Sequence, residues 1–164
     1  MKPAVMVRKG GELPLSGDSL TGLLRAVLAK GKPFRFRARG WSMSPFIRDG
    51  DVVTVSPLWG RRPRTGEIVA FLHPGTGKAA VHRVVRMRDG RFSVRGDNAF
   101  GPDGALSPDR ILGAVTRVER DGRNVRGTGG PASLAVALLS RTGALVRGLS
   151  LSRRLAGRGK KGGS

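Results

Sequence analysis

The chain has 164 residues and carries 31 Lys and Arg side chains against 11 Asp and Glu, a formal net charge of +20. It contains no cysteine, which excludes disulfides, thiolate metal sites and a cysteine nucleophile, and its 5% aromatic content leaves little for stacking RNA bases. The length fits one domain with its own core, and the 26 glycines and 10 prolines favour a turn-rich β fold.

The positive charge is concentrated at the two ends of the chain. Residues 1–40 hold nine basic and two acidic side chains, residues 117–164 hold eleven and two, and residues 41–116 hold eleven and seven. Carboxylate chemistry is therefore expected in the middle segment. Basic ends attract polyanions, either nucleic acid or anionic lipid, although an Arg-rich surface that serves only solubility explains the charge equally well.

The first predicted element is a helix near the N-terminus. Asp18 and Ser19 can cap a helix that runs to about Lys30. Its apolar positions fall on one face: Leu20, Leu23, Leu24, Val27 and Leu28. The longest apolar stretch, 20–28, contains Arg25 and is shorter than the ~20 residues that span a bilayer. No secretory signal is recognisable, so an amphipathic helix packed on a domain is favoured over membrane-surface binding.

Residues 33–125 have the sequence pattern of a β domain. Short β-branched or alternating runs are separated by turns, at 34–37, 51–55, 67–72, 79–87, 92–94 and 111–118. Asp89-Gly90 is a strong hairpin signal, and Asp121-Gly122 repeats it. Six or seven strands at this spacing predict a mainly β fold, a folded-over antiparallel sheet or partly closed barrel.

The C-terminal part is predicted to lie outside this β domain. Residues 126–131 form a Gly-rich linker, residues 132–156 can form an amphipathic helix, and the basic residues 157–164 are expected to be disordered. Arg141 and Arg147 make the helix a poor membrane-spanning segment. It can lie on a membrane surface or dock on the body of the protein. With residues 1–32 as a helical segment, this completes the predicted organisation.

Two motif-like features do not support a cofactor or metal. Residues 75–78, Gly-Thr-Gly-Lys, lack the earlier glycine and the following Ser or Thr of a phosphate-binding loop. His73 and His82 lie nine residues apart with no cysteine partner, which is a weak pattern for metal binding. We expect neither a cofactor nor a bound metal.

The most informative segment is residues 40–55, Gly-Trp-Ser-Met-Ser-Pro-Phe-Ile-Arg-Asp-Gly-Asp-Val-Val-Thr-Val. Ser42 lies at a tight turn before a strand, and a serine there gains chemical meaning only from a base elsewhere. The segment resembles the nucleophile motif of the signal peptidase and repressor-type serine peptidases, the S24/S26 group. The positions that fit its Gly-x-Ser-Met-x-Pro and Gly-Asp pattern are Gly40, Ser42, Met43, Pro45, Gly50 and Asp51.

Two later blocks resemble the same family in the same order, so that the resemblance covers roughly residues 34–118. Residues 66–71 are similar to its Gly-acid-hydrophobic strand, and residues 81–85, Val-His-Arg-Val-Val, follow where the family has its general base. Residues 96–98, Gly-Asp-Asn, and the strand at 112–115 resemble its third block. The resemblance implies a serine peptidase with this sheet architecture.

Within that family, His82 in place of Lys resembles the archaeal and endoplasmic-reticulum branch of signal peptidases, which pairs Ser with His and an acid. The resemblance implies Ser42 as nucleophile, His82 as base and Asp103 as the acid that orients it, with Asp97 the second choice for the acid. Asp109 is interpreted as a turn residue. A neutral imidazole can take a hydroxyl proton near physiological pH, and an acid on its other nitrogen fixes the tautomer. Supporting roles are expected for Asp97, Gly40, Met43 and Pro45.

Two features depart from the signal peptidase pattern. Gly40 stands where many signal peptidases have a Ser that stabilises the oxyanion, so the Ser42 amide is left as the expected donor. The chain shows no transmembrane anchor or export signal. We therefore expect a cytoplasmic enzyme that processes a precursor peptide or protein, either free or held on the inner membrane face through its basic ends.

Two other functions compete with this prediction. The fold can serve as a basic module for nonspecific nucleic-acid or partner binding, a role that does not require Ser42, His82 and Asp103 together. Specific nucleic-acid recognition is not expected. A self-cleaving regulator needs a DNA-binding domain, and the 40 residues before Trp41 are too short for one.

Overall fold

The computed structural model describes residues 4–8, 11–99, 101 and 104–125. Within these ranges the protein is one antiparallel sheet with helix α1 (Gly17–Ala29) against it. The strands are β1 (Ala4–Arg8), β2 (Gly11–Leu15), β3 (Phe34–Arg37), β4 (Val52–Ser56), β5 (Ile68–Leu72), β6 (Ala79–Arg88), β7 (Arg91–Arg95), β8 (Ala105–Leu106), β9 (Ile111–Arg120) and β10 (Arg123–Asn124). A short 3-10 turn, η1 (Pro108–Arg110), precedes β9.

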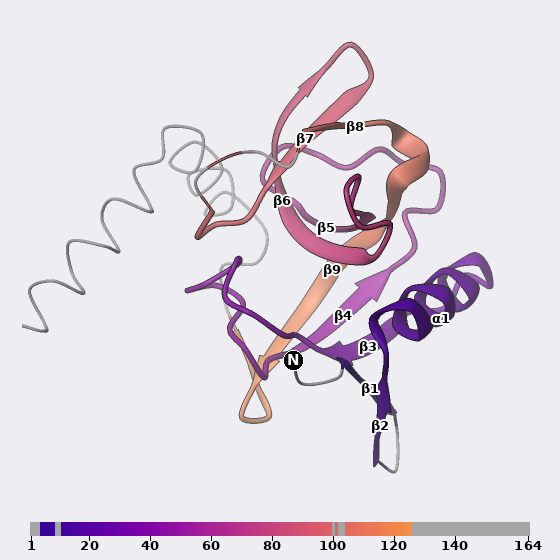
Figure 1. Ribbon diagram of the computed structural model, residues 1–164, viewed down its shortest axis with the longest axis vertical. Helices are drawn as coiled ribbons and strands as arrows, with labels where there is room; N and C mark the ends of the chain where they lie inside the picture. Colours follow the sequence, from indigo (N-terminus) through magenta and orange to yellow (C-terminus); the bar gives the residue numbers. More distant parts are fainter. Residues whose placement is uncertain (1–3, 9–10, 100, 102–103, 126–164) are drawn as a thin grey trace, which may run out of the picture.

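The strands follow the order β2-β1-β3-β4-β9-β5-β6-β7-β8, with β10 paired to β9. This confirms the predicted mainly β, folded-over antiparallel sheet, which does not close into a barrel (Figure 1). Strand β9 joins the two halves of the sheet, because Ala114–Glu119 pair with β4 and Ile111–Ala114 pair with β5. Register shifts in the pairing of β9 with both neighbours mark β-bulges, which bend a sheet.

Helix α1 begins where the sequence predicts, with a different capping residue. Ser16 is the N-cap, and its hydroxyl accepts a hydrogen bond from the Ser19 amide at 3.1 Å. Leu20, Leu24 and Leu28 are buried and face the sheet, as the helical spacing predicts. Thr21 ties the helix to the sheet, since its hydroxyl accepts a hydrogen bond from the Ala79 amide at 2.8 Å.

The sequence analysis missed the hairpin of β1 and β2, which precedes α1 inside the segment expected to be helical. The backbone of Ala4–Arg8 pairs with Gly11–Leu15, and β1 also pairs with β3. Pro14 argues against a central strand, but β2 lies at the end of the strand order, where a missing amide donor is tolerated. The predicted linker, C-terminal helix and tail lie outside the described residues.

Two groups of buried side chains form the core. One lies between α1 and the sheet: Leu20, Leu24, Leu28, Phe34, Phe36, Met43, Ile47, Val53, Val55, Ile68, Ala70, Val115 and Val118. The other lies within the β5–β8 half: Val69, Phe71, Val84, Phe92, Val94 and Leu106. The predicted Asp89-Gly90 turn joins β6 and β7, where Arg88 pairs with Arg91. Both groups adjoin the segments that carry Ser42 and His82.

Replacing Leu24, which is 1% exposed, with Ala is expected to lower the free energy of unfolding by about 2–5 kcal/mol, because it leaves a cavity under α1. The exposed Arg25 on the same helix is the matched control, and Arg25→Ala should change stability by less than ~0.5 kcal/mol. Urea denaturation measures both. Equal effects of the two variants would contradict the packing of α1 on the sheet.

Candidate active site

Ser42 lies in the loop between β3 and β4, and backbone hydrogen bonds close this loop at its base. The Ala38 amide donates to the Asp51 carbonyl at 2.8 Å, and the Gly50 amide donates to the Ala38 carbonyl at 3.0 Å. Gly40 has a φ of 93°, a conformation that favours glycine, and its amide donates to the Asp49 carboxylate at 2.9 Å. This local geometry accounts for a glycine two residues before Ser42.

Buried side chains anchor the loop to the body of the protein. Met43 and Ile47 are 4% and 3% exposed and pack in the core beside α1, while Ser42 itself is exposed. Pro45 follows in the same turn, and its peptide bond with Ser44 is cis. The predicted supporting residues Gly40, Met43 and Pro45 thus all lie in the loop that carries Ser42.

Arg120 of β9 clamps the end of this loop. Its guanidinium donates to both carboxylate oxygens of Asp51, at 2.9 and 2.7 Å, and to the Phe46 carbonyl at 3.3 Å. Asp51 is 3% exposed and also accepts from the Arg48 amide. The hydrogen bond to Asp51 raises the pKa of Arg120 above its ordinary value. Asp51, singled out by its Gly-Asp motif, therefore holds the loop in place.

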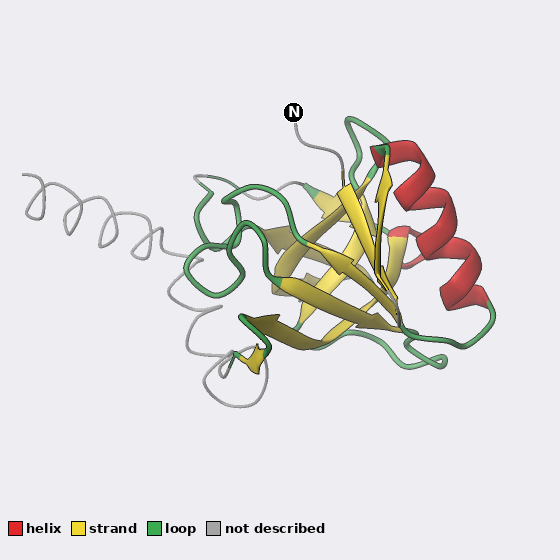
Figure 2. Ribbon diagram, turned by 90° about the horizontal axis from the view of Figure 1, so that it is seen from below, coloured by secondary structure: helices red, strands yellow, loops and turns green. Residues whose placement is uncertain are grey.

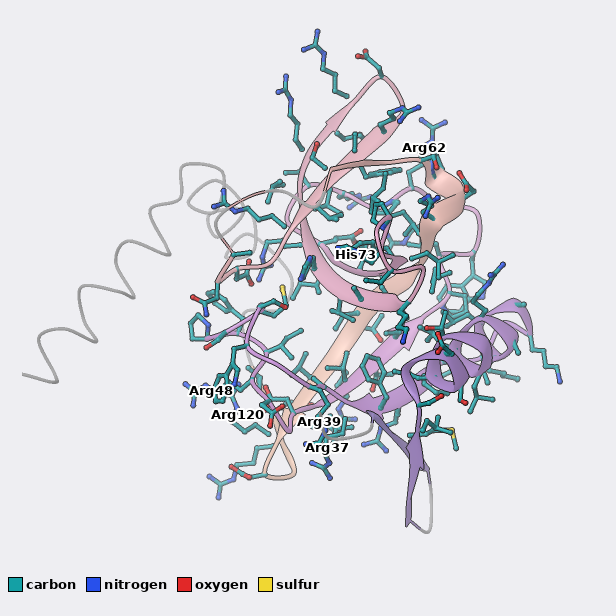
Figure 3. All side chains as sticks on the ribbon, viewed as in Figure 1. Arg37, Arg39, Arg48, Arg62, His73 and Arg120 are labelled. Carbon is teal, nitrogen blue, oxygen red and sulfur yellow. The ribbon has the colours of Figure 1, made fainter. Side chains whose placement is uncertain are left out.

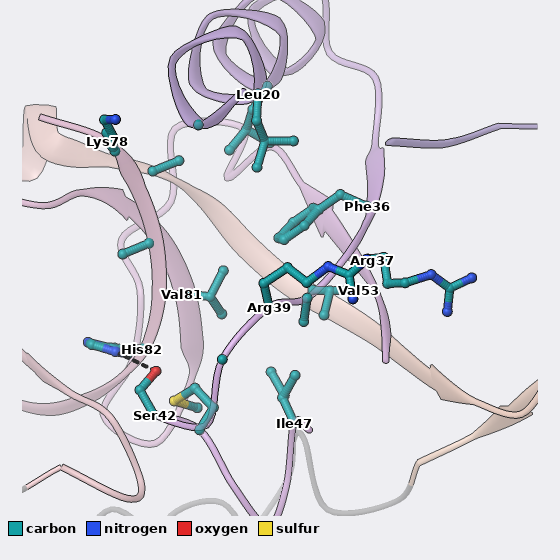
Figure 4. Close-up of a pocket in the computed structure, with 17 residues that line it drawn as sticks. Leu20, Phe36, Arg37, Arg39, Ser42, Ile47, Val53, Lys78, Val81 and His82 are labelled. Carbon is teal, nitrogen blue, oxygen red and sulfur yellow. Dashed lines mark hydrogen bonds between the residues drawn. The ribbon is translucent and has the colours of Figure 1, made fainter. Parts of the chain in front are cut away.

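The structure brings Ser42 and His82 together from segments forty residues apart. The Ser42 hydroxyl and His82 Nε2 lie 3.0 Å apart, as the dashed line in Figure 4 shows. His82 is 8% exposed, and its ring lies 5.6 Å from that of Phe71, centroid to centroid. Its backbone belongs to β6, where it pairs with Val69 of β5. This is hydrogen-bonding distance for a nucleophile and its base.

A second turn, Gly96-Asp97-Asn98, packs directly against Ser42. The Asn98 amide donates to the Ser42 carbonyl at 2.7 Å, and the Asn98 side chain donates to the Trp41 carbonyl at 3.3 Å. A Cβ on Gly96 would lie 2.6 Å from the Ser42 carbonyl oxygen and 3.2 Å from His82 Nε2. Only a residue without a side chain fits between the two, which gives the glycine of this motif a physical reason.

Asp97 forms a fully buried ion pair with Arg83, the neighbour of His82. Arg83 donates to both Asp97 carboxylate oxygens, at 2.8 and 2.7 Å, and both side chains are 0% exposed. The same guanidinium donates to the Gly66 carbonyl and lies over the Phe46 ring, 5.3 Å from its centroid. Arg83 thus links the turn at 96–98, the start of β5 and the Ser42 loop.

Three further residues were considered from the sequence as an acid or a metal ligand, and no described contact joins them to Ser42. Asp103, the expected acid, lies outside the described residues. Asp109 lies in η1, and a hydrogen bond with the Ser107 side chain lowers its pKa, as befits a turn residue. His73 lies at the end of β5, where its Nδ1 accepts from the Gly75 amide. The described residues contain no cluster of three His, Asp or Glu that could hold a metal.

Sequence reasoning missed Arg83 and Arg120 as parts of the site. Both follow recognisable motif positions, the base at 82 and the closing strand at 111–118, but an arginine in a basic chain is expected at the surface. Figure 3 labels Arg120 beside Arg48 at the end of the loop. The useful signal is the two motif aspartates, Asp51 and Asp97, each of which needs a cationic partner when buried.

A serine hydroxyl from a loop within hydrogen-bonding distance of a histidine nitrogen from the sheet is the pair of groups that nucleophilic catalysis by serine requires. Residues 11–116 match the sequence model of the Peptidase S24-like family, and the chain therefore belongs to that family. No curated protein matches the chain. Within the described ranges, no helical segment has the length and hydrophobicity needed to cross a bilayer.

Gly96→Ala is expected to lower the free energy of unfolding by about 1–3 kcal/mol, because the new methyl group overlaps the Ser42 carbonyl. Hydrogen exchange of the Asn98 amide should become faster at the same time. Gly101→Ala is the control, since no atom of the described residues lies within 4 Å of the added carbon there. Unchanged exchange in the Gly96 variant would show that the two turns do not pack this closely.

Arg83→Met is expected to cost about 3–5 kcal/mol of stability, because it leaves the Asp97 carboxylate buried without its cation. Adding Asp97→Leu to it should recover most of that loss, since both charges are then gone. Arg86→Met, at an exposed position of the same strand, is the control. Additive losses in the double variant, measured by denaturation, would argue against a direct pair.

Proposed function

We propose that this protein is a serine endopeptidase that cleaves a precursor peptide or protein, in the manner of signal peptidases. The observation that carries the proposal is the 3.0 Å contact between the Ser42 hydroxyl and His82 Nε2 in a member of the S24-like peptidase family. Ser42 attacks the scissile carbonyl, His82 takes the hydroxyl proton and gives it to the leaving amine, and water then hydrolyses the ester formed on Ser42.

Backbone amides next to Ser42 are the proposed donors to the oxyanion. The loop turns twice here, since the Ser44 amide donates to the Trp41 carbonyl and the Ile47 amide to the Met43 carbonyl. A bond between the first carbonyl and the fourth amide of a turn leaves the two amides in between without a partner inside that turn. Ser42 and Met43 contribute these amides, which can replace the side-chain hydroxyl that Gly40 lacks. Asp103 is proposed to orient His82 through its second ring nitrogen.

The substrate is proposed to bind as an extended strand along the first half of β6, which ends at His82. The pairing of β6 with β7 begins at Arg83, so Ala79–His82 are paired with β5 alone among the described strands. A peptide added there would run past Ser42 and Phe46 and gain backbone hydrogen bonds as a new strand. Contact with anionic lipid through the basic ends and a cytoplasmic location remain predictions.

The alternative is a catalytically inactive member of the family that binds nucleic acid or a partner through its charge. One hollow among the described residues contains Arg35, Arg37, Arg48 and Arg120, but Asp49, Asp51, Glu119 and Asp121 line it too. Four cations and four anions cancel there, so this hollow offers no net attraction for phosphate. This hollow therefore gives the binding module no support.

The test is incubation of the purified protein with a diverse peptide mixture, with new termini identified by mass spectrometry. Cleavage should fall at least ~10³-fold in Ser42→Ala and His82→Ala, since each removes one partner of the proton transfer. Asp103→Asn should also reduce the rate. Equal cleavage by the wild type and the Ser42 variant would overturn the proposal. No cleavage combined with salt-sensitive DNA binding would favour the binding module.

A further inference from the structure

A pocket of about 300 Å³ opens beside Ser42 and His82 and extends to helix α1, as Figure 4 shows. Its volume is about ten times the ~30 Å³ that a water molecule occupies in the liquid. The walls are largely apolar and come from α1, the β3–β4 loop region and β6: Leu20, Leu24, Phe36, Ala38, Met43, Ile47, Val53, Ala79, Ala80 and Val81. A cavity of this size is large for a single alanine side chain.

The charged side chains among the described lining residues of the pocket are all cationic. Arg37, Arg39 and Lys78 are among the lining residues, and none of the described lining residues is Asp or Glu. Lys78 forms an ion pair with Asp18, and the Arg37 guanidinium donates to the Gly50 carbonyl. Figure 4 shows Arg37 extending away from Ser42. A substrate lysine or arginine would face these cations and no carboxylate among the lining residues, so its charge would not be compensated there.

The backbone of β6 is arranged to present a peptide to this pocket. In an antiparallel ladder the hydrogen-bonding groups of successive residues point alternately to opposite edges. The Val84 amide donates to Glu67 beside β5, and the Lys78 carbonyl accepts from His73, so the even-numbered residues bond toward β5. Val81 therefore directs its amide and carbonyl to the other edge, where the Ala79 amide already donates to Thr21.

We propose that the pocket selects substrates with a large apolar side chain, Leu, Met or Phe, close to the scissile bond. A peptide hydrogen-bonded along Val81 passes Ser42, and alternate side chains of an extended strand point to one face. The side chain that faces the core then enters the pocket between β6 and the Ser42 loop. The inference rests on the proposed function, because it assigns the substrate class of that same site.

The first experiment measures binding without cleavage. Immobilised Ser42→Ala protein is offered blocked peptides with a fixed central Leu or a fixed central Ala in a random background of small residues, and retained peptides are quantified by mass spectrometry. Leu peptides should be enriched at least about tenfold over Ala peptides, because a methylene in an apolar pocket already gives about that discrimination. Equal retention would overturn the pocket assignment.

The second experiment measures cleavage of the same two peptide sets by the wild-type protein. A Leu preference in both experiments supports the pocket and the peptidase together. A Leu preference in binding without any Ser42-dependent cleavage would refute the proposed function and leave the pocket as a binding site for apolar side chains. Cleavage that favours Ala would refute the pocket assignment and leave the peptidase standing.

A variant that fills the pocket at Ala79 tests whether this part of the pocket binds the apolar side chain of the substrate. Ala79 packs on the core beside α1, at the end of β6 away from His82, so Ala79→Leu should reduce the Leu enrichment to about one. Ala105→Leu adds the same volume at an exposed position of β8 and should retain the wild-type preference. Circular dichroism checks that both variants fold. A folded Ala79→Leu protein with the wild-type preference would overturn the proposal.

Discussion

The site depends on the contact between two turns that are far apart in the sequence. The Asn98 amide holds the Ser42 carbonyl at 2.7 Å, and Gly96 has no side chain to separate them. Because the Ser42 loop is also closed at its base and clamped by Arg120, this contact fixes the remaining freedom of the serine. The 3.0 Å approach to His82 follows from that constraint, since the histidine is already held within the sheet.

Strand β6 combines several of the requirements of the site. It supplies His82, the edge beside Val81 that pairs with no other described strand, and the buried Arg83, whose partners lie on three other segments. Charge burial is normally costly, and here the bidentate pair with Asp97 compensates for it. The immediate surroundings of His82 therefore include a cation and an anion of opposite unit charge, so the pair adds a fixed scaffold and no net charge.

The strands and the helix were predictable because their local patterns agree with the sheet. Alternation in Phe34–Arg37, where Phe34 and Phe36 are buried, and the Asp89-Gly90 turn gave the correct positions. The β1–β2 hairpin and the two-residue β8 were not predicted, because their stability comes from pairing with neighbours. The meeting of Ser42 and His82 followed from a family resemblance, and the ion pairs with buried aspartates came only from the structure.

The separation of the interacting parts along the chain has a consequence for biosynthesis. The Ser42 loop, β6 and the turn at 96–98 must all be present before the nucleophile and its partner histidine can meet. The loop is made before the turn that holds it, because synthesis proceeds from the N-terminus. A growing chain therefore carries its serine for some time without a complete site.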